Sequence, residues 1–590
     1  MSHPEVVIVG SGLAGLVAAV ELQKRGFKVT LLERGGPESI GGKIGTHLCD
    51  QCTGVHLHTH HIFMNWYRNF WKVVEDLGWD TGETFEPRET VNYLRSTTEM
   101  PGASYDSRLS SVTNEGSIWH ALDNMMDGPE SPANMFLYGY SLLDLITKPY
   151  RRETILDNTS VNGFMASRWY ATPQAAMLHQ RFLSVAFANA SFQTSAETYK
   201  NFIRFSTVDP VPQYYVMKQG VRERLISELR SKLLRGDPKA NIPPGSIETG
   251  ITLVGIVLGT GSAGGSTKAV KKLEVLKAGG SPGAVAESEI ELKEGTSIIL
   301  AVSLDGLIQL VDEDLYEASS NFQRVHSLRS QTIASLELQY QKKVEGIPRN
   351  HTALMNSPHH LSLFDGTQVS CSEGVKPQTG TNLTVSISEF DALDAWDQQH
   401  PALRTSWNRK RRAKSASTSG ANRNWDRVKN MIFAEVQDFL PELPVLKAGD
   451  RMCLVRNSQA RLFINDVHDW SWQPTTDCEG IENLFLAGEY VQNPIDVVTV
   501  ESAVVTGLQA AESVRARANH GKEVEIIRPE AYSTDMARNA VAALAPMALG
   551  AATLARTENI DLDPYRAFAE NFDNWLDNAE SFWRAMNRIY

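Results

Sequence analysis

The stretch VVIVGSGLAG, residues 6–15, decides the fold of this 590-residue chain. Its first four residues are apolar and β-branched, which predicts a buried parallel strand. Residues 16–24 predict a helix that ends before Gly26, because glycine is favoured just past a helix end. Residues 27–32 predict a second strand that ends at Glu33. The order of strand, glycine-rich turn, helix, strand and acid is typical of a dinucleotide-binding unit.

Each glycine of this turn has its own physical reason. Gly10 permits the tight turn, Gly12 lets the backbone approach a pyrophosphate, and Gly15 lets the helix pack closely on the strand. The helix N-terminus offers free N–H groups to the phosphates. Glu33 can accept both hydroxyls of an adenosine ribose. These features alone do not separate NAD from FAD.

Composition excludes several classes of protein. Hydrophobic residues make up 42% and charged residues 21% of the chain, which is ordinary for a globular protein. The net charge of −12 lacks the basic excess of a nucleic-acid binder, so we expect no nucleic-acid partner. Five cysteines fit a reducing compartment better than a disulfide framework. With no signal peptide and no spanning apolar run visible, we expect a cytoplasmic protein, with peripheral membrane contact as the alternative.

A second motif lies near the C-terminus. Residues 482–487 predict an apolar strand that leads into Gly488 and Glu489. Residues 499–511 then predict a helix whose small residues permit close approach.

The two motifs resemble those of the flavin amine oxidase superfamily, which reads E-R-x-x-x-x-G-G-R near the N-terminus and L-A-G-D … S-M-E-G-A-x-x-S-G near the C-terminus. The resemblance implies FAD as the cofactor, a ribityl contact for Glu489, and a helix N-terminus facing the flavin ring. Lys43 stands where the family has arginine, and Glu489 where it has aspartate. The implied cofactor contacts are Gly10, Gly12, Leu13, Ala14, Gly15, Glu33, Arg34, Gly41, Gly42, Lys43, Ile251, Gly488, Glu489, Val498, Thr499 and Val500.

Residues 54–78 are similar to one branch of that superfamily. Phytoene and ζ-carotene desaturases and hydroxysqualene dehydroxylases carry G-x-H-x-F-F-G-x-Y-x-N here, followed by a helix ending in L-G. The matching positions are His61, Phe63, Tyr67, Asn69, Leu77 and Gly78, while Asn65 replaces a glycine. Because histidines beside a flavin can act as acid or base, the catalytic candidates are His58, His60, His61 and Tyr67.

The same region holds a group of cysteines and histidines that suggests other chemistry. Cys49 and Cys52 precede His56, His58 and His60, so a zinc site and a redox thiol pair are both alternatives. The histidines alternate as on a strand, however, and no second ligand pair follows at the usual spacing. We therefore favour a strand-loop that lines the flavin pocket, with no metal.

These observations predict an α/β fold: a Rossmann-type FAD-binding domain of the glutathione-reductase-like kind, an inserted α+β substrate domain and a C-terminal helical extension. The expected FAD-binding parts are residues 1–80, 216–310 and 446–520, the substrate parts 81–215 and 311–445, and the extension 521–590. Four segments are expected to depart from this pattern. They are an irregular stretch at 80–130, loose hairpin loops at 257–290, a surface loop at 408–424 and a pair of packed helices at 540–555.

The branch resemblance predicts a desaturase that removes hydride from a C–H bond of an isoprenoid, polyene or lipid-like substrate. We expect a long apolar pocket drawn from residues 131–235 and 320–400, and a quinone or O₂ as electron acceptor. The helical tail could cap the pocket or make a homodimer contact. An amine or amino-acid oxidase is the second hypothesis, in which Trp470 and Trp472 supply aromatics and Arg461 a carboxylate anchor. A redox-neutral, FAD-dependent double-bond isomerase is the third.

Overall fold

The structure is a computed structural model. The residues that it describes are 3–45, 47–48, 55–56, 61–113, 118–148, 155–208, 212–237, 242–262, 267–278, 285–368, 380–391, 393, 425–457, 461–529 and 534–557.

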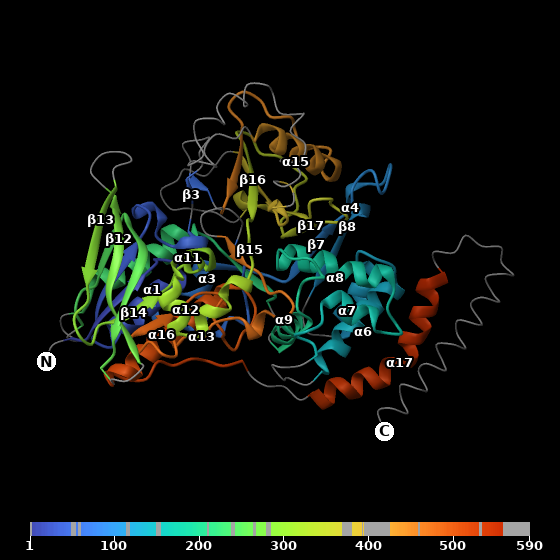
Figure 1. Ribbon diagram of the computed structural model, residues 1–590. Coiled ribbons are helices and arrows are strands. Elements are labelled where there is room, and N and C mark those ends of the chain that lie inside the picture. Colours follow the sequence, from blue (N-terminus) through green and yellow to red (C-terminus); the bar gives the residue numbers. More distant parts are fainter. Residues whose placement is uncertain are drawn as a thin grey trace, which may run out of the picture.

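A five-stranded parallel sheet forms the centre of one half of the molecule (Figure 1). Its strand order is β10-β2-β1-β14-β22. The strands are β1 (Glu5–Val9), β2 (Lys28–Glu33), β10 (Ser246–Thr249), β14 (Ser297–Leu300) and β22 (Leu484–Leu486). They come from distant parts of the sequence, and every neighbouring pair runs parallel. Their apolar runs are buried on both faces, as expected for a parallel sheet covered on both sides. The predicted α/β Rossmann-type fold is therefore confirmed.

Different elements cover the two faces of this sheet. Helices α1 (Leu13–Lys24) and α16 (Val500–Ala518) pack on the face that carries Val6 and Ile8. The other face packs against a three-stranded antiparallel sheet of β11 (Ile251–Thr260), β12 (Lys268–Ala278) and β13 (Val285–Glu291), and against α11 (Leu304–Leu310), α12 (Glu313–Ala318) and α13 (Ser320–Gln323). Of the loose hairpin loops predicted over 257–290, the hairpin arrangement is present, but most of that range is strand. The glycine-rich links 263–266 and 279–284 lie outside the described residues.

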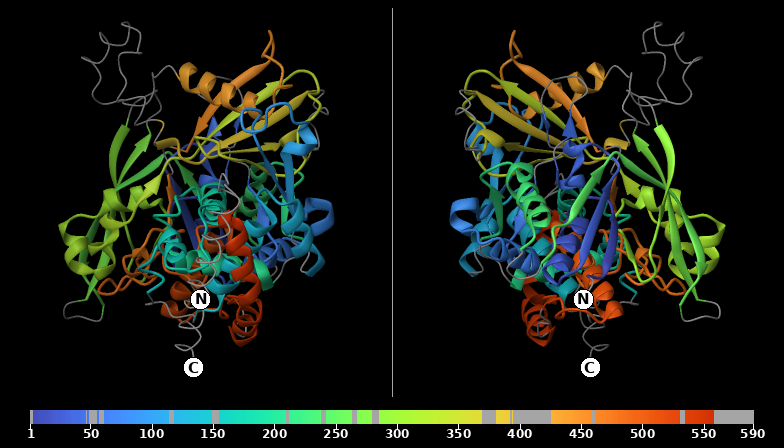
Figure 2. Two further views of the ribbon diagram at one scale, coloured as in Figure 1. Left: turned by 90° about the vertical axis from the view of Figure 1, so that its right-hand side faces the viewer. Right: turned by 90° about the vertical axis from the view of Figure 1, so that its left-hand side faces the viewer.

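A seven-stranded sheet forms a second layer at the opposite end of the molecule from α17 (Figure 2). Its order is β20 (Arg451–Arg456), β16 (Ala334–Tyr340), β19 (Thr381–Ile387), β18 (Leu361–Asp365), β17 (Thr352–Leu354), β7 (Thr90–Leu94) and β8 (Leu109–Thr113). Leu336 and Leu338 face α15 (Asp426–Phe439), whose Ile432 and Val436 complete one apolar core. The segment 408–424 lies outside the described residues.

Residues 80–130 are ordered where the structure describes them, which corrects the expectation of an irregular stretch. They form α3 (Thr81–Thr84), β6 (Phe85–Arg88), β7, α4 (Tyr105–Arg108), β8 and α5 (Ile118–Asp127). Strand β8 is the edge strand of the large sheet and is half exposed, so it lacks the apolar run of a central strand. Short strands β5 (Phe63–Met64) and β6 flank β9 (Tyr214–Met217) in a separate small sheet.

Further helices of the described residues pack on α1, on α16 and on one another. They are α2 (Arg68–Asp76), α6 (Pro132–Ile146), α7 (Val161–Ala166), α8 (Pro173–Ala186), α9 (Ala196–Val208) and α10 (Ser227–Arg235), the last preceded by a π-helical turn, Arg222–Ile226.

The C-terminal helix α17 (Thr534–Thr557) packs along α6 through buried Ala545, Ala548, Ala552 and Ala555. It is one helix rather than the predicted pair, and it changes direction along its length (Figure 1). Pro546 lies inside it, and a proline removes one helical hydrogen bond and bends a helix without ending it. Among the described helices, α17 alone has the length and apolar composition of a membrane span, with 22% of its most apolar window buried.

Candidate functional site

The glycine-rich turn between β1 and α1 has the geometry of a phosphate-binding loop. Gly10 has φ +104°, and a Cβ at this position would lie 2.4 Å from the carbonyl oxygen of Ala301. A Cβ on Gly15 would lie 2.2 Å from the carbonyl oxygen of Gly10. A Cβ on Gly12, in contrast, would meet no atom within 4 Å. The open side of the turn at Gly12, followed by the first turn of α1 with Leu13 and Ala14, fits the approach of a pyrophosphate.

Glu33 lies at the end of β2 and points back to this turn. Its carboxylate accepts hydrogen bonds from the Ser11 backbone N–H at 3.1 Å, from the Ser11 hydroxyl at 2.5 Å and from the Gly35 N–H at 2.8 Å. Exposed Arg34 follows it. Strand β10 pairs with β2 up to Glu33, and the chain then continues into Ile251, the first residue of β11. The predicted adenosine-side residues are therefore neighbours.

The predicted Gly-Gly-basic turn lies directly against the first turn. Gly41 has φ +113°, and its N–H donates to the Ser11 carbonyl at 3.0 Å. A Cβ on Gly42 would lie 3.0 Å from the Cα of Gly12. Only glycine allows the two backbones to approach this closely.

The C-terminal motif meets the N-terminal motifs through an ion pair. The Lys43 ammonium contacts the Glu489 carboxylate, and both side chains are largely buried. The same carboxylate oxygen accepts a hydrogen bond from the Phe463 N–H at 3.0 Å. Phe463 belongs to β21 (Leu462–Phe463), which pairs with β15 (Ser330–Gln331) just before the large sheet begins. Glu489 therefore lies between the end of the central sheet and this small pair of strands.

The N-terminus of α16 completes this arrangement. Gly488 has φ +142°, and its N–H donates to the Thr506 hydroxyl at 3.2 Å. The Val498 N–H donates to the side chain of Asn465 at 3.0 Å. Thr499 and Ser502 form a capping box, and Val500 begins the helix. These contacts fix the direction of the helix N-terminus and of its positive dipole.

Glu501 is a buried carboxylate of the site that the sequence-based list of candidates omits. It accepts hydrogen bonds from the Asn69 N–H at 2.8 Å, the Asn69 side-chain amide at 2.7 Å and the Phe70 N–H at 2.8 Å. Burial raises its pKa to about 7, although these hydrogen bonds oppose the shift. An acid in the first turn of a helix is common, so Glu501 itself does not stand out in the sequence. The only sequence feature that points to this contact is the match of Asn69 to the branch motif. Its partner lies 432 positions away.

Of the four predicted catalytic residues, the structure brings Tyr67 to the N-terminus of α16. It is buried, and its pKa lies above the usual value because of burial and the nearby Glu501 carboxylate, while a hydrogen bond with Thr499 opposes the shift. His61 is half-buried and precedes β5. His58 and His60 lie outside the described residues, as do Cys49 and Cys52. Over the part of the chain that the structure describes, no group of three or more His, Cys, Asp or Glu side chains could hold a metal ion.

The residues proposed for an amine or amino-acid oxidase have other contacts. Arg461 pairs with Asp391 at 2.8 Å and donates to the Ser330 carbonyl at 2.7 Å, so its charge is already balanced. Trp472 packs against the second apolar core and near His468. These contacts of Arg461 and Trp472 do not support the predicted carboxylate anchor or the predicted aromatic pair at the flavin.

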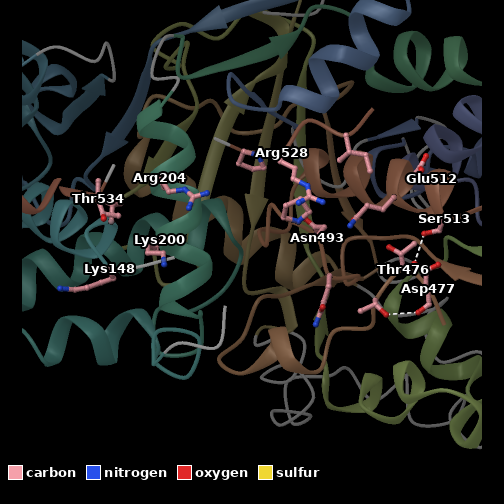
Figure 3. A pocket seen from close by; sticks show the side chains of 17 residues that line it. Lys148, Lys200, Arg204, Thr476, Asp477, Asn493, Glu512, Ser513, Arg528 and Thr534 are labelled. Atoms are coloured by element: carbon pink, nitrogen blue, oxygen red, sulfur yellow. Dashed lines mark hydrogen bonds between the residues drawn. The ribbon is translucent and has the colours of Figure 1, made fainter. Parts of the chain in front are cut away.

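A cavity of about 700 Å³ lies between α9, α16 and the segment that leads to α17 (Figure 3). None of the predicted cofactor or catalytic residues lines it.

Comparisons with known proteins agree with this geometry. A family model described as an NAD(P)-binding Rossmann-like domain matches residues 8–77. A search of curated proteins finds no match.

Solved structures are similar over most of the chain. An oxidoreductase from Methanosarcina mazei has 13% sequence identity and a TM-score of 0.56, covering 86% of this chain and 100% of its own. Cyclohexylamine oxidase from Brevibacterium oxydans has 12% identity and a TM-score of 0.54, covering 88% of this chain and 100% of its own. A putrescine oxidase bound to putrescine has 13% identity and a TM-score of 0.55, covering 87% of this chain and 99% of its own. At this level of identity the likeness establishes a shared fold.

Proposed function

We propose that this protein is an FAD-dependent oxidoreductase that takes hydride from a C–H bond of its substrate. The contact between Lys43 and Glu489 carries the proposal, because it joins two motifs, each incomplete alone, into one site. The residues present fit FAD: the turn is open at Gly12, and the Glu33 carboxylate stands at the end of β2. The similar structures include two named amine oxidases, which supports redox chemistry on this fold.

FAD, when bound, supplies a flavin ring that accepts hydride at N5. The N–H groups at the start of α1 receive the pyrophosphate. Glu33 exchanges its hydrogen bond from the Ser11 hydroxyl for hydroxyls of the adenosine ribose. Glu489 orients the ribityl hydroxyls while Lys43 balances its charge. The N-terminus of α16 directs its N–H groups and positive dipole toward the flavin ring.

The first substrate candidate is an isoprenoid, polyene or other lipid-like molecule that becomes desaturated. Tyr67 belongs to a chain of aromatic contacts beside α16, which supports an apolar substrate. The Trp66 ring lies 4.7 Å from the Tyr67 ring and 5.0 Å from the Phe205 ring. A polyene delocalises the positive charge that develops as hydride leaves, so a water molecule or a weak acceptor can take the proton from the neighbouring carbon. A quinone or O₂ would serve as the electron acceptor.

The second candidate is an amine or amino-acid oxidase, which the similarity to putrescine and cyclohexylamine oxidases favours. A buried carboxylate on β16 also favours it. Glu337 is 4% exposed, and its hydrogen-bond donors, the Ser335 and Thr384 hydroxyls, carry no charge. Burial raises the pKa of Glu337 to about 7, and an ammonium group of a substrate would favour its charged form. The redox-neutral isomerase remains a third candidate, supported by the same cofactor geometry.

Anaerobic reduction of the flavin tests the proposal and separates the three candidates. The FAD-loaded protein is mixed with polyenes, terpenoids, fatty acids and amines, and loss of flavin colour and product mass are recorded. Desaturation predicts bleaching by an apolar compound and a product that has lost two hydrogens. Bleaching by amines alone supports the oxidase, and a product of unchanged mass supports the isomerase.

The control is Gly12→Val, which fills the open side of the turn and should leave the protein colourless. A wild-type protein that remains colourless after incubation with FAD contradicts the whole proposal.

A further inference from the structure

The cavity beside α16 is built from separate parts of the chain that meet away from the cofactor motifs. Lys200 and Arg204 come from α9 on one side, and Arg528 comes from the segment before α17 (Figure 3). Thr476, Asp477, Glu512 and Ser513 lie on the other side. The volume of about 700 Å³ is within the range of small-molecule sites.

Cations outnumber carboxylates in the lining of this cavity. Among the lining residues, Lys148, Lys200, Arg204 and Arg528 are cationic, while Asp477 and Glu512 are acidic. Glu512 is engaged outside the cavity, because Arg515 binds both of its oxygens at 2.6 and 3.0 Å. Asp477 accepts a hydrogen bond from Ser513 at 3.0 Å. Lys148 and Lys200 are also paired, with Asp144 at 2.7 Å and Glu197 at 2.6 Å, so the two arginines set the positive character of the cavity.

Two of the cationic side chains are deeply buried at the cavity wall. Lys200 is 1% exposed and Arg204 is 6% exposed. Lys200 pairs with Glu197 at 2.6 Å, yet burial still lowers the pKa of its ammonium group. Both side chains line the cavity, which places their cationic groups beside any anion that enters it.

Polar groups on the other side of the cavity lack partners within the described residues. Thr476 is 7% exposed, and its hydroxyl makes no hydrogen bond. The side-chain oxygen of Gln509, also at the wall, makes none. Thr476 and Gln509 thus bring unsatisfied polar atoms to the cavity wall, and the Ser513 hydroxyl, which already donates to Asp477, can accept a further hydrogen bond.

We propose that this cavity binds an organic phosphate of mononucleotide size. The phosphate lies between α9 and Arg528, because arginine guanidinium groups match phosphate oxygens in geometry and charge. The neutral part of the ligand, with hydroxyl and amide groups, lies against Thr476, Gln509 and Ser513. This site is separate from the FAD site, since the two share no residue.

The test uses the FAD-loaded protein and adenosine 5′-monophosphate as the probe, with adenosine as the uncharged comparison. Binding is measured by calorimetry while flavin absorbance verifies that FAD stays in place. We expect adenosine 5′-monophosphate to bind, to bind more weakly at high salt, and to bind about tenfold or more tightly than adenosine.

Arg528→Glu is the main variant, because Arg528 is exposed and its replacement leaves the core intact. Its affinity for adenosine 5′-monophosphate should fall about tenfold or more, since a hydrogen bond to a charged group is lost and a repulsion is added. Arg538→Glu on α17 makes the same charge change at a residue outside the cavity lining and should leave binding unchanged. Thr476→Val removes a hydroxyl from the cavity wall beside the neutral part of the ligand and should lower the affinity for adenosine 5′-monophosphate. Absence of binding, equal binding of adenosine, or an equal loss in the two arginine variants would overturn the proposal.

Discussion

The ammonium group of Lys43 and the carboxylate of Glu489 are in direct contact although 446 positions separate the two residues. The Phe463 N–H donates to the same carboxylate and brings the two-stranded sheet of β15 and β21 to this point. The pair thus connects the Gly-Gly turn, the end of β22 and this small sheet.

Glu489→Gln should lower the affinity for FAD about tenfold to a hundredfold, because a hydrogen bond to a charged group is worth about 1.5–3 kcal/mol. Titration of the apoprotein with FAD, followed by flavin fluorescence, measures this change. Lys24→Met removes a lysine paired with Asp76 away from the site and serves as the matched control. Equal FAD affinity in wild type and Glu489→Gln would show that Glu489 does not touch the cofactor.

The buried Glu501 predicts a pH dependence of stability. Its pKa is raised to about 7 in the folded protein from a usual value of 4.5. The folded state therefore holds this proton more tightly than the unfolded state, and stability falls as pH rises from the unfolded pKa to the folded one. The loss is on the order of 3 kcal/mol, since each pKa unit corresponds to about 1.4 kcal/mol.

Urea unfolding across this pH range compares the wild type with Glu501→Gln, which does not titrate. The wild type should lose more stability than the variant as pH rises. Glu337→Gln gives a second comparison, since burial also raises the pKa of Glu337 to about 7. Parallel pH profiles for wild type and Glu501→Gln would contradict the assignment.

Gly507 should tolerate no side chain. A Cβ at Gly507 would lie 2.5 Å from the carbonyl oxygen of Ala14, in the first turn of α1. Gly507→Ala should separate α1 from α16, lower the melting temperature and reduce FAD content, with a cost of about 1–3 kcal/mol typical of overpacking. Gly550→Ala is the matched control, because a Cβ at Gly550 in α17 would meet no atom within 4 Å. That control should be neutral or stabilising by up to about 1 kcal/mol, and a similar loss in both variants would exclude the close-approach explanation.

Helix α17 leaves an apolar surface uncovered by the described residues. Met547 is 58% exposed and Leu554 is 61% exposed. We expect this surface to make the peripheral membrane contact that the sequence suggests. Sedimentation with vesicles of neutral and anionic phospholipid should carry down the wild type, and Met547→Glu combined with Leu554→Glu should abolish it. A wild type that stays in the supernatant with both vesicles contradicts this expectation.

The sequence predicted the nucleotide-binding half well because its signals are local. The run 6–9, the glycines of the turn and Glu33 lie within one short unit, and their spacing reflects contacts with near neighbours. The strand before Gly488 and the helix after it were predicted for the same reason. A continuous apolar run and a helix of small residues each leave a clear pattern.

Other features depend on contacts that no local pattern records. The polar composition of residues 90–94 and 109–113 suggested a loop. They form strands because they pair at one end of the large sheet. Glu501 becomes a buried group only when Asn69 and Phe70 approach it. The cavity beside α16 exists only where several distant segments meet.

The position of β22 has a consequence for biosynthesis. This strand completes the central sheet, yet it leaves the ribosome only after more than four-fifths of the chain has been made, and until then β14 is an open edge. A nascent chain with an unpaired apolar strand is prone to association with other chains. We expect chaperones to bind this protein late in translation. Truncated products that end before residue 484 should aggregate and should not bind FAD.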